Sequence, residues 1–411
     1  MDFYKKAAKK LPEAAALPSQ YLGMYGDFIT KNASAVSQIE SALRSLTYII
    51  PGRFRESEIA SESLHSGVQV LSLYHDSLLY RAADRLPANQ KPHPSTHARY
   101  TRFWTENSPS YKRIALTLQM IRYTELLWEM AAKRRGEKAR WRAIVILEAI
   151  KAICRLLLLR LTNSRPLLSP PLPEREVDPK ALEESASETE NPFKADSLMT
   201  DDPPSPPSAT SSAADDLNWT MPRTGLSLPS LPNPSEISNY LLSKVLTPDD
   251  IKTPKALLHR VTGPGQLAEI LHILRPVLYA LALQRWTTIN TTTTTTDAGG
   301  HRTSSKASWR PWLLGLTIEY GARQLAKRDF SERIAGGLRG LTGLERDELR
   351  KRGWALAWWG MRGAFYENVT RPYISTVAAK LRGKLVLDIL GGVLEDYEYL
   401  WDEYYFSTAT L

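Results

Sequence analysis

The side chains that most often carry catalysis or bind metals are few in this chain and widely spaced. Of the seven histidines, only His93 and His97 stand four residues apart, the spacing that places two ligands on one face of a helix. Pro92 and Pro94 disfavour a helix there. The single cysteine, Cys154, excludes both an internal disulfide and a zinc site built from several thiolates. Because no HExxH motif, phosphate-binding loop or nucleophile elbow occurs, we predict no enzyme activity, no cofactor and no metal site.

A different chemistry is indicated by six cationic side chains within ten residues, a pattern suited to lipid phosphate groups. The six are Lys133, Arg134, Arg135, Lys138, Arg140 and Arg142. The chain carries a net charge of +9, and 12 acidic and three basic residues between Glu174 and Asp216 leave +18 for the remainder. Such a balance is typical of proteins that contact anionic lipid or nucleic acid, although a solvated basic surface has the same composition. Because no nucleic-acid-binding motif surrounds the cluster, we predict anionic membrane lipid as a partner and no nucleic acid.

The basic cluster leads directly into a long apolar segment, Ala143–Leu161, whose length approaches the ~20 residues that cross a bilayer as a helix. Glu148, Lys151 and Arg155 fall within about 60° of one another on a helical wheel. In an isolated span these charges cost about 8–10 kcal/mol, and the eleven Ile, Leu and Val residues return only about 3–7 kcal/mol. The segment therefore spans a membrane only if Glu148 pairs with Lys151 or if another helix covers the polar stripe. A helix lying in the membrane interface and a buried helix of a soluble bundle are the alternatives.

Two further apolar segments, Leu267–Trp286 and Ser308–Ala326, lie on either side of a threonine-rich connector. Each segment contains an Arg-Pro step, and proline removes an N–H and disfavours helical geometry in the residue before it. The first step predicts a kink inside a helix and the second predicts the start of a helix. The residues at these steps are Arg275 and Pro276 in the first segment, and Trp309, Arg310, Pro311 and Trp312 in the second.

The first of these two segments is too interrupted to cross a membrane as a straight helix. Glu269, His272 and Arg275 precede the proline, so only Pro276–Leu283 is continuously apolar, far short of ~20 residues. We therefore predict a kinked, membrane-associated hairpin that contacts the Ala143–Leu161 helix.

Elsewhere, apolar residues recur at steps of three and four, and no stretch alternates with period two for long enough to form a sheet. We predict an all-α protein, a helical bundle with membrane-associated amphipathic and apolar helices and a long disordered linker. The other expected helices are Tyr21–Thr30, Ala33–Tyr48, Glu56–Ala83, Tyr111–Lys133, Ser235–Leu246, Glu345–Tyr366, Tyr373–Leu390 and Val393–Phe406.

Composition divides the chain into four parts. We expect a flexible N-terminus over residues 1–20, an N-terminal helical region over 21–161, a disordered acidic, proline-rich linker over 162–234, and a C-terminal helical region over 235–411 with a threonine-rich loop at 287–307. The linker holds 14 of the 27 prolines and the acidic run, a composition that cannot bury enough apolar surface to offset chain entropy.

Four blocks of sequence follow one another outside the linker and the threonine-rich loop. They are Tyr25–Asp76 with its core of Pro51, Gly52, Arg53 and Phe54, then Ala139–Leu161, then LAEILHILRPVLYALAL with SWRPWLLGLTIEYGA, and finally AFYENVTRPYISTVAAKL with DYEYLWDEYYF. Together and in this order they resemble the peroxin-16 family of peroxisomal membrane biogenesis proteins. The long acidic linker and the threonine insert look like the expanded loops of fungal members.

The resemblance implies a non-enzymatic protein of the peroxisomal membrane that acts in peroxisome biogenesis, recruiting or docking factors for the insertion of peroxisomal membrane proteins. It implies peroxin-3 and peroxin-19 as partners, and a route to the peroxisome by way of the endoplasmic reticulum. A basic cluster and a following apolar segment serve membrane targeting in the family, which assigns that role to Lys133–Arg142 and Ala143–Leu161. The alternative function, which rests on the amphipathic helix and the basic body, is a peripheral lipid-binding protein that shapes or divides peroxisomal membranes.

Overall fold

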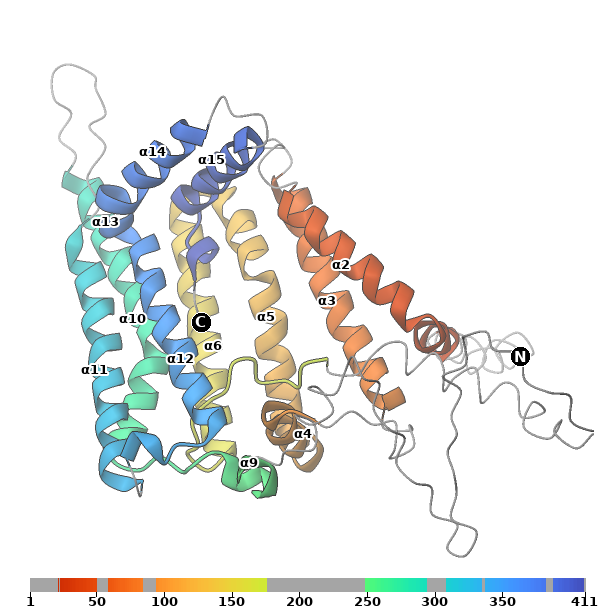
Figure 1. The fold of residues 1–411 in the computed structure, drawn as a ribbon. Coiled ribbons are helices and arrows are strands. Elements are labelled where there is room, and N and C mark those ends of the chain that lie inside the picture. Colours follow the sequence, from red (N-terminus) through yellow and green to blue (C-terminus); the bar gives the residue numbers. More distant parts are fainter. Residues whose placement is uncertain are drawn as a thin grey trace, which may run out of the picture.

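The computed structural model describes residues 21, 23–49, 58–83, 94–175, 248–293, 308–334, 337–381 and 387–409. Every regular element in these ranges is helical, which confirms the all-α prediction. Six long helices form a row in which each contacts the next (Figure 1). In order along the row they are α2 (Ala33–Ile49), α3 (Glu58–Ala83), α5 (Pro109–Lys133), α6 (Glu137–Leu161), α10 (Pro264–Thr293) and α11 (Trp309–Arg333).

Shorter elements cover the two ends and one side of this row (Figure 1). One end of the row is where α5 begins and where α11 ends. Four short elements lie there: α4 (Thr96–Asn107), α9 (Pro248–Ile251), η4 (Pro254–Leu257) and η5 (Gly337–Arg339). Beside the row lies α12 (Gly343–Ala357), followed by η6 (Trp358–Met361), α13 (Gly363–Phe365) and the π-helical η7 (Tyr366–Thr370). The opposite end is crossed by α14 (Arg371–Leu381) and α15 (Leu387–Glu403), and η8 (Phe406–Thr408) follows.

Local sequence explains where these helices begin. The Ser108 hydroxyl accepts the Tyr111 N–H, and Pro109 occupies a first-turn position of α5 that needs no donor. At the start of α12, the Thr342 and Glu345 side chains each accept the other residue's backbone N–H, which forms a capping box. The Ser308 side chain caps α11, so the helix start predicted from Arg310-Pro311 is confirmed.

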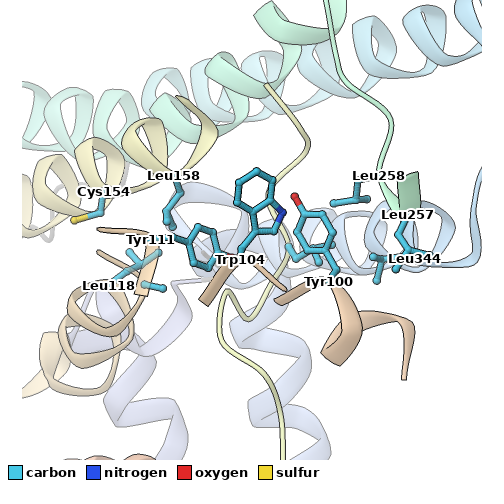
Figure 2. Packing of buried hydrophobic residues seen from close by; sticks show 11 residues of the cluster. Tyr100, Trp104, Tyr111, Leu118, Cys154, Leu158, Leu257, Leu258 and Leu344 are labelled. Atoms are coloured by element: carbon cyan, nitrogen blue, oxygen red, sulfur yellow. The ribbon is translucent and has the colours of Figure 1, made fainter. Parts of the chain in front are cut away.

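An aromatic and aliphatic core closes one end of the row, where α4, α5, α6, η4 and α12 meet (Figure 2). Trp104 packs between the Tyr100 and Tyr111 rings, whose centroids each lie 6.2 Å from its own. Leu158 of α6 and Leu257 of η4 are almost fully buried against this group. The core therefore joins elements from both sides of the predicted linker into one packed body.

The predicted linker starts too early. Thr162–Arg175 is packed, because Arg165 donates to the carbonyls of Lys255 and Leu258 at 3.2 Å and Tyr111 donates to the Pro171 carbonyl at 3.0 Å. Leu168 is buried in the aromatic core. The prolines of Thr162–Arg175 favour an extended segment, and here that segment packs across the ends of helices. Composition alone does not distinguish such a segment from a free linker. Residues 176–234, and the N-terminal 1–20, lie outside the described residues.

Several predicted boundaries also differ from the structure. Pro276 lies within a helix that continues to Thr293, so residues 287–293 of the predicted threonine-rich loop are helical, while 294–307 lie outside the described residues. The predicted Glu345–Tyr366 helix is broken after Ala357 into 3₁₀, α and π turns. Conversely, α15 runs through Gly391 and Gly392 without a break, because packing overrides the weak helix propensity of glycine.

Candidate membrane interface

The charges of the α6 segment point into the protein. Lys151 is fully buried, and its ammonium lies 3.1 Å from the Glu148 carboxylate one turn away and 2.7 Å from Glu125 of α5. Arg155 is buried on the same side of the helix. Both conditions set by the sequence are therefore met, since the charges pair and a neighbouring helix covers the polar stripe. Pairing offsets part of the cost of removing these charges from water.

Two further ion pairs tie the C-terminal helices together inside the bundle. The Arg275 guanidinium of α10 lies 2.7 Å from the Glu319 carboxylate of α11, and His272 lies 3.0 Å from the same carboxylate. Arg352 of α12 contacts both oxygens of Glu269 at 2.6 and 2.7 Å. A bidentate pair of this kind fixes geometry as well as charge. The charges that interrupt the apolar segments in the sequence therefore lie inside the fold, where they are paired.

The outward side of α6 is apolar instead. Ile146, Ile150, Ile153 and Leu157 are exposed at helical spacing, with exposed fractions from 38% to 58%. Exposed Arg142 and Arg160 bound this stripe. They are 18 residues apart, which corresponds to about 27 Å at the rise of an α-helix, close to the ~30 Å thickness of a bilayer's hydrocarbon core.

The next helices in the row continue this apolar surface. On α10, exposed Leu267, Leu278 and Leu281 lie in one line with half-exposed Leu271 and Leu274. On α11, Leu313, Leu314 and Tyr320 are exposed after Trp309 and Arg310, so its apolar stretch is shorter. A contiguous run of exposed leucines and isoleucines is unusual for a water-soluble surface, and charged side chains that face the bundle interior are the arrangement expected in lipid.

Length and composition alone select one helix, Pro264–Trp286 of α10, as a candidate span among the described residues, and half of that window is buried inside the fold. By the same measure α6 carries too many charges. The structure changes this assessment because the charges of α6 face other helices and not the surroundings.

The six residues of the basic cluster divide into two groups. Arg134, Arg135, Lys138 and Arg142 are exposed near the turn between α5 and α6. Lys133 instead forms an ion pair with Glu403 and lies 4.5 Å from the centre of the Tyr404 ring. Arg140 lies 2.9 Å from the buried Glu129 carboxylate and donates to the Glu403 carbonyl at 2.6 Å.

Glu129 is the centre of a C-terminal attachment that the sequence did not reveal. Its carboxylate accepts the backbone N–H groups of Tyr405 and Phe406 at 2.7 and 2.9 Å. Its side chain is fully buried. Together with Arg140, it fastens the end of the described chain to the turn between α5 and α6. The only sequence signal was an acidic residue within an apolar helix, which does not identify its partner.

The residues of the third sequence block have separate roles. Arg275 and Pro276 are buried in α10 and Pro311 is buried in α11. Trp309 and Arg310 are exposed. Trp312 is half-buried, donates to the Trp359 carbonyl at 2.9 Å and stacks on Phe365. The four predicted site residues Pro51, Gly52, Arg53 and Phe54 lie outside the described residues.

Close packing around Trp359 explains one glycine of that block. A Cβ added at Gly315 of α11 would lie 2.2 Å from the Trp359 ring, so any side chain here would require the buried Trp359 ring to move. Trp359 also packs edge-on against Tyr279 of α10, with ring centroids 5.0 Å apart. Aromatic packing thus holds α10, α11 and η6 together at the end opposite the Trp104 core.

Comparison with known proteins finds relatives that are described as membrane proteins. A family model described as "Peroxisomal membrane protein (Pex16)" matches residues 23–403. The chain is 22% identical over 366 residues to "Peroxisomal membrane protein PEX16" of Schizosaccharomyces pombe, covering 86% of this chain and 89% of the relative. It is also 22% identical over 394 residues to "Peroxisome biogenesis protein 16" of Arabidopsis thaliana, covering 92% of this chain and 98% of the relative. No solved structure matches.

Proposed function

The chain belongs to the Pex16 family of peroxisomal membrane proteins, and from this premise we propose that it is a membrane-embedded, non-enzymatic docking factor for the insertion of other peroxisomal membrane proteins. Membership establishes its place in the peroxisomal membrane and in peroxisome biogenesis. The docking role, with peroxin-3 and peroxin-19 as partners and a route through the endoplasmic reticulum, is the proposal.

The observation that carries the proposal is the surface formed by α6, α10 and α11. This surface carries stripes of exposed leucine and isoleucine, and the charged side chains of the same helices are paired on their inner side. The exposed cations of the basic cluster lie beside one edge of the surface. Such a body sits stably in a bilayer with its cations at the lipid phosphates. A helical body held in this way provides a fixed platform on which soluble factors assemble.

Carbonate extraction of isolated peroxisomes, combined with protease protection, tests the membrane part. We expect the chain to stay in the pellet at alkaline pH and to give a protected fragment that contains α6 and α10. Complete release into the supernatant would instead support the peripheral protein that shapes or divides membranes.

The docking part requires a separate experiment. In cells that lack the chain, we expect other peroxisomal membrane proteins to be mislocalised, and the purified chain in vesicles to retain peroxin-3 or peroxin-19. Normal peroxisomal membranes in such cells, together with no retention of either partner, would refute docking while leaving membrane insertion intact.

A further inference from the structure

The hairpin of α2 and α3 carries a second apolar surface, separate from the membrane interface. Contacts along the hairpin show that the two helices run antiparallel, since Thr47 meets His65 and Arg44 meets Ser72. At 100° per residue, Ile39, Leu43 and Leu46 lie about a quarter-turn from the side of α2 that faces α3. All three are exposed, by 37% to 59%.

The apolar residues of α3 lie on the same side of the hairpin. Leu64 and Leu71 are exposed by 48% and 45%, and they are displaced from the inward side of α3 by a similar angle and in the same rotational sense. In antiparallel helices, equal displacements place residues on one common face. The opposite side of α3 is covered by α5, where Ser66 donates to the Tyr123 carbonyl at 2.9 Å. The apolar face therefore lies on the side of the hairpin that α5 leaves uncovered, and the hairpin itself stands at one end of the row of helices (Figure 1).

Gly67, between Leu64 and Leu71, has no explanation within one copy of the chain. Glycine in the middle of a helix costs about 0.5–1 kcal/mol relative to alanine. A Cβ added at Gly67 would meet nothing within 4 Å. No neighbour within the described chain therefore explains why this position has no side chain. A glycine on an exposed helical face is accounted for when another helix backbone approaches closely at that point.

The face is also free of charge. Among the described side chains of α2, and of α3 as far as Tyr80, every exposed residue is uncharged. Interfacial membrane helices carry basic residues on their polar face, and this hairpin presents serine, alanine and glutamine there. The part of the chain outside the acidic run is strongly basic, so two copies repel one another except where a surface lacks charge.

We propose that this face is a homodimer interface, in which the hairpins of two copies pack face to face as a four-helix bundle with Gly67 near the two-fold axis. The shorter helix α2, with 17 residues, is about 25 Å long, and two packed helices are about 20 Å wide. The face therefore covers about 500 Å² on each copy, which reaches the ~1,000 Å² in total that a specific interface should bury. Isologous packing places Leu43 and Leu71 of one copy against the same kind of leucine in the other.

Cysteine cross-linking of the full chain in vesicles tests the interface. Native Cys154 is buried, so the parent chain should form no disulfide. Leu71→Cys, on the exposed face of α3, should form a disulfide-linked dimer on mild oxidation, whereas Thr117→Cys, at an exposed position on α5, should not. Equal cross-linking of the two variants, or none at Leu71→Cys, would overturn the proposal.

Mass measurement by light scattering in detergent gives an independent readout. We expect the parent to be dimeric and the Leu43→Glu/Leu71→Glu variant to be monomeric with unchanged helical content. Gly67→Ala should raise thermal stability slightly and weaken dimerisation about tenfold, because the added methyl holds the helices apart. A dimer that survives the double substitution would show that the chain dimerises through another surface. A fluorescent probe at residue 67 that is strongly quenched by brominated lipid would show that this face contacts the membrane instead.

Discussion

Glu62 of α3 is an acid whose environment favours the protonated form. Burial raises its pKa to about 7, although the Ser66 hydroxyl donates a hydrogen bond that acts in the opposite direction. In the unfolded chain a glutamate titrates near pH 4.5, so the folded protein binds more protons between about pH 4.5 and 7. Stability therefore falls as the pH rises through this window and stays lower above it.

The Glu62→Gln substitution should remove this pH dependence. A change of one unit in pKa corresponds to about 1.4 kcal/mol, and Glu62 is only partly shielded from water. We therefore expect the free energy of unfolding of the variant to exceed that of the parent by about 2 kcal/mol at pH 8 and to equal it at pH 4. Thermal unfolding in detergent across this range measures the difference. Glu332→Gln, which removes an exposed carboxylate, serves as the control. An unchanged pH profile in Glu62→Gln would show that Glu62 is solvated.

The residues of the basic cluster should separate into structural and targeting groups. Arg140→Ala leaves the buried Glu129 carboxylate without its cation, and we expect a loss of about 3 kcal/mol in the free energy of unfolding. Replacing exposed Arg134, Arg135, Lys138 and Arg142 together by glutamine should change stability by less than about 1 kcal/mol.

The same four-residue variant should reach the peroxisome less efficiently, because each cation near an anionic leaflet contributes about 1 kcal/mol. The peroxisomal fraction of a tagged chain measures this. If Arg140→Ala alone reduced targeting and the quadruple variant did not, the exposed cations would have no part in targeting.

At the scale of single elements, the orientation of α6 decides how a charge is tolerated. Ile153 lies in the exposed stripe, and an arginine facing acyl chains costs about 2.5–3.5 kcal/mol. Ile153→Arg should therefore reduce the carbonate-resistant fraction of the chain while leaving its unfolding temperature in detergent nearly unchanged. Thr117→Arg, on the exposed side of α5, should change neither. Full carbonate resistance of Ile153→Arg would place this stripe outside the lipid.

The apolar segments show how far the sequence goes at this scale. The existence of α6, α10 and α11 followed from their length and composition, and the start of α11 followed from the Arg310-Pro311 step. The orientation of Glu148, Lys151 and Arg155 did not follow, because a helical wheel shows that charges share a side and not what that side faces. The partner Glu125 lies 26 residues from Lys151, beyond the reach of any periodicity argument.

At the scale of the whole molecule, the C-terminal segment joins the two halves of the chain. Tyr405 and Phe406 pack with Ile144 of α6, Tyr279 of α10 and Trp359, and their N–H groups bind Glu129 of α5. Truncation after Glu403 should therefore lower the free energy of unfolding by about 3–5 kcal/mol, because it removes this packing and leaves a buried carboxylate undersatisfied.

The Tyr405→Phe substitution keeps the packing of the C-terminal segment and removes only a hydroxyl group, so it serves as a control for the truncation. The Tyr405 hydroxyl is buried without a hydrogen-bond partner among the described residues, so Tyr405→Phe should be neutral or slightly stabilising. Thermal unfolding of both variants in detergent gives the comparison. A truncated chain as stable as the parent would mean that the C-terminal attachment does not support the bundle.

The sequence by itself determined that the chain is helical, that it has a basic cluster followed by apolar segments, and that its ordered blocks resemble one family. These features depend on composition, on steps of three and four residues, and on local signals such as the Arg-Pro steps, all of which are readable along the chain. Only the tertiary structure decided that Arg140 and Lys133 are structural, that Thr162–Arg175 is packed, and that the charges of α6 and α10 face inward. The physical reason is that an ion pair or a buried surface belongs to two elements at once, and the partner of Lys151, Arg275 or Glu129 is set by how helices pack across long separations in the chain.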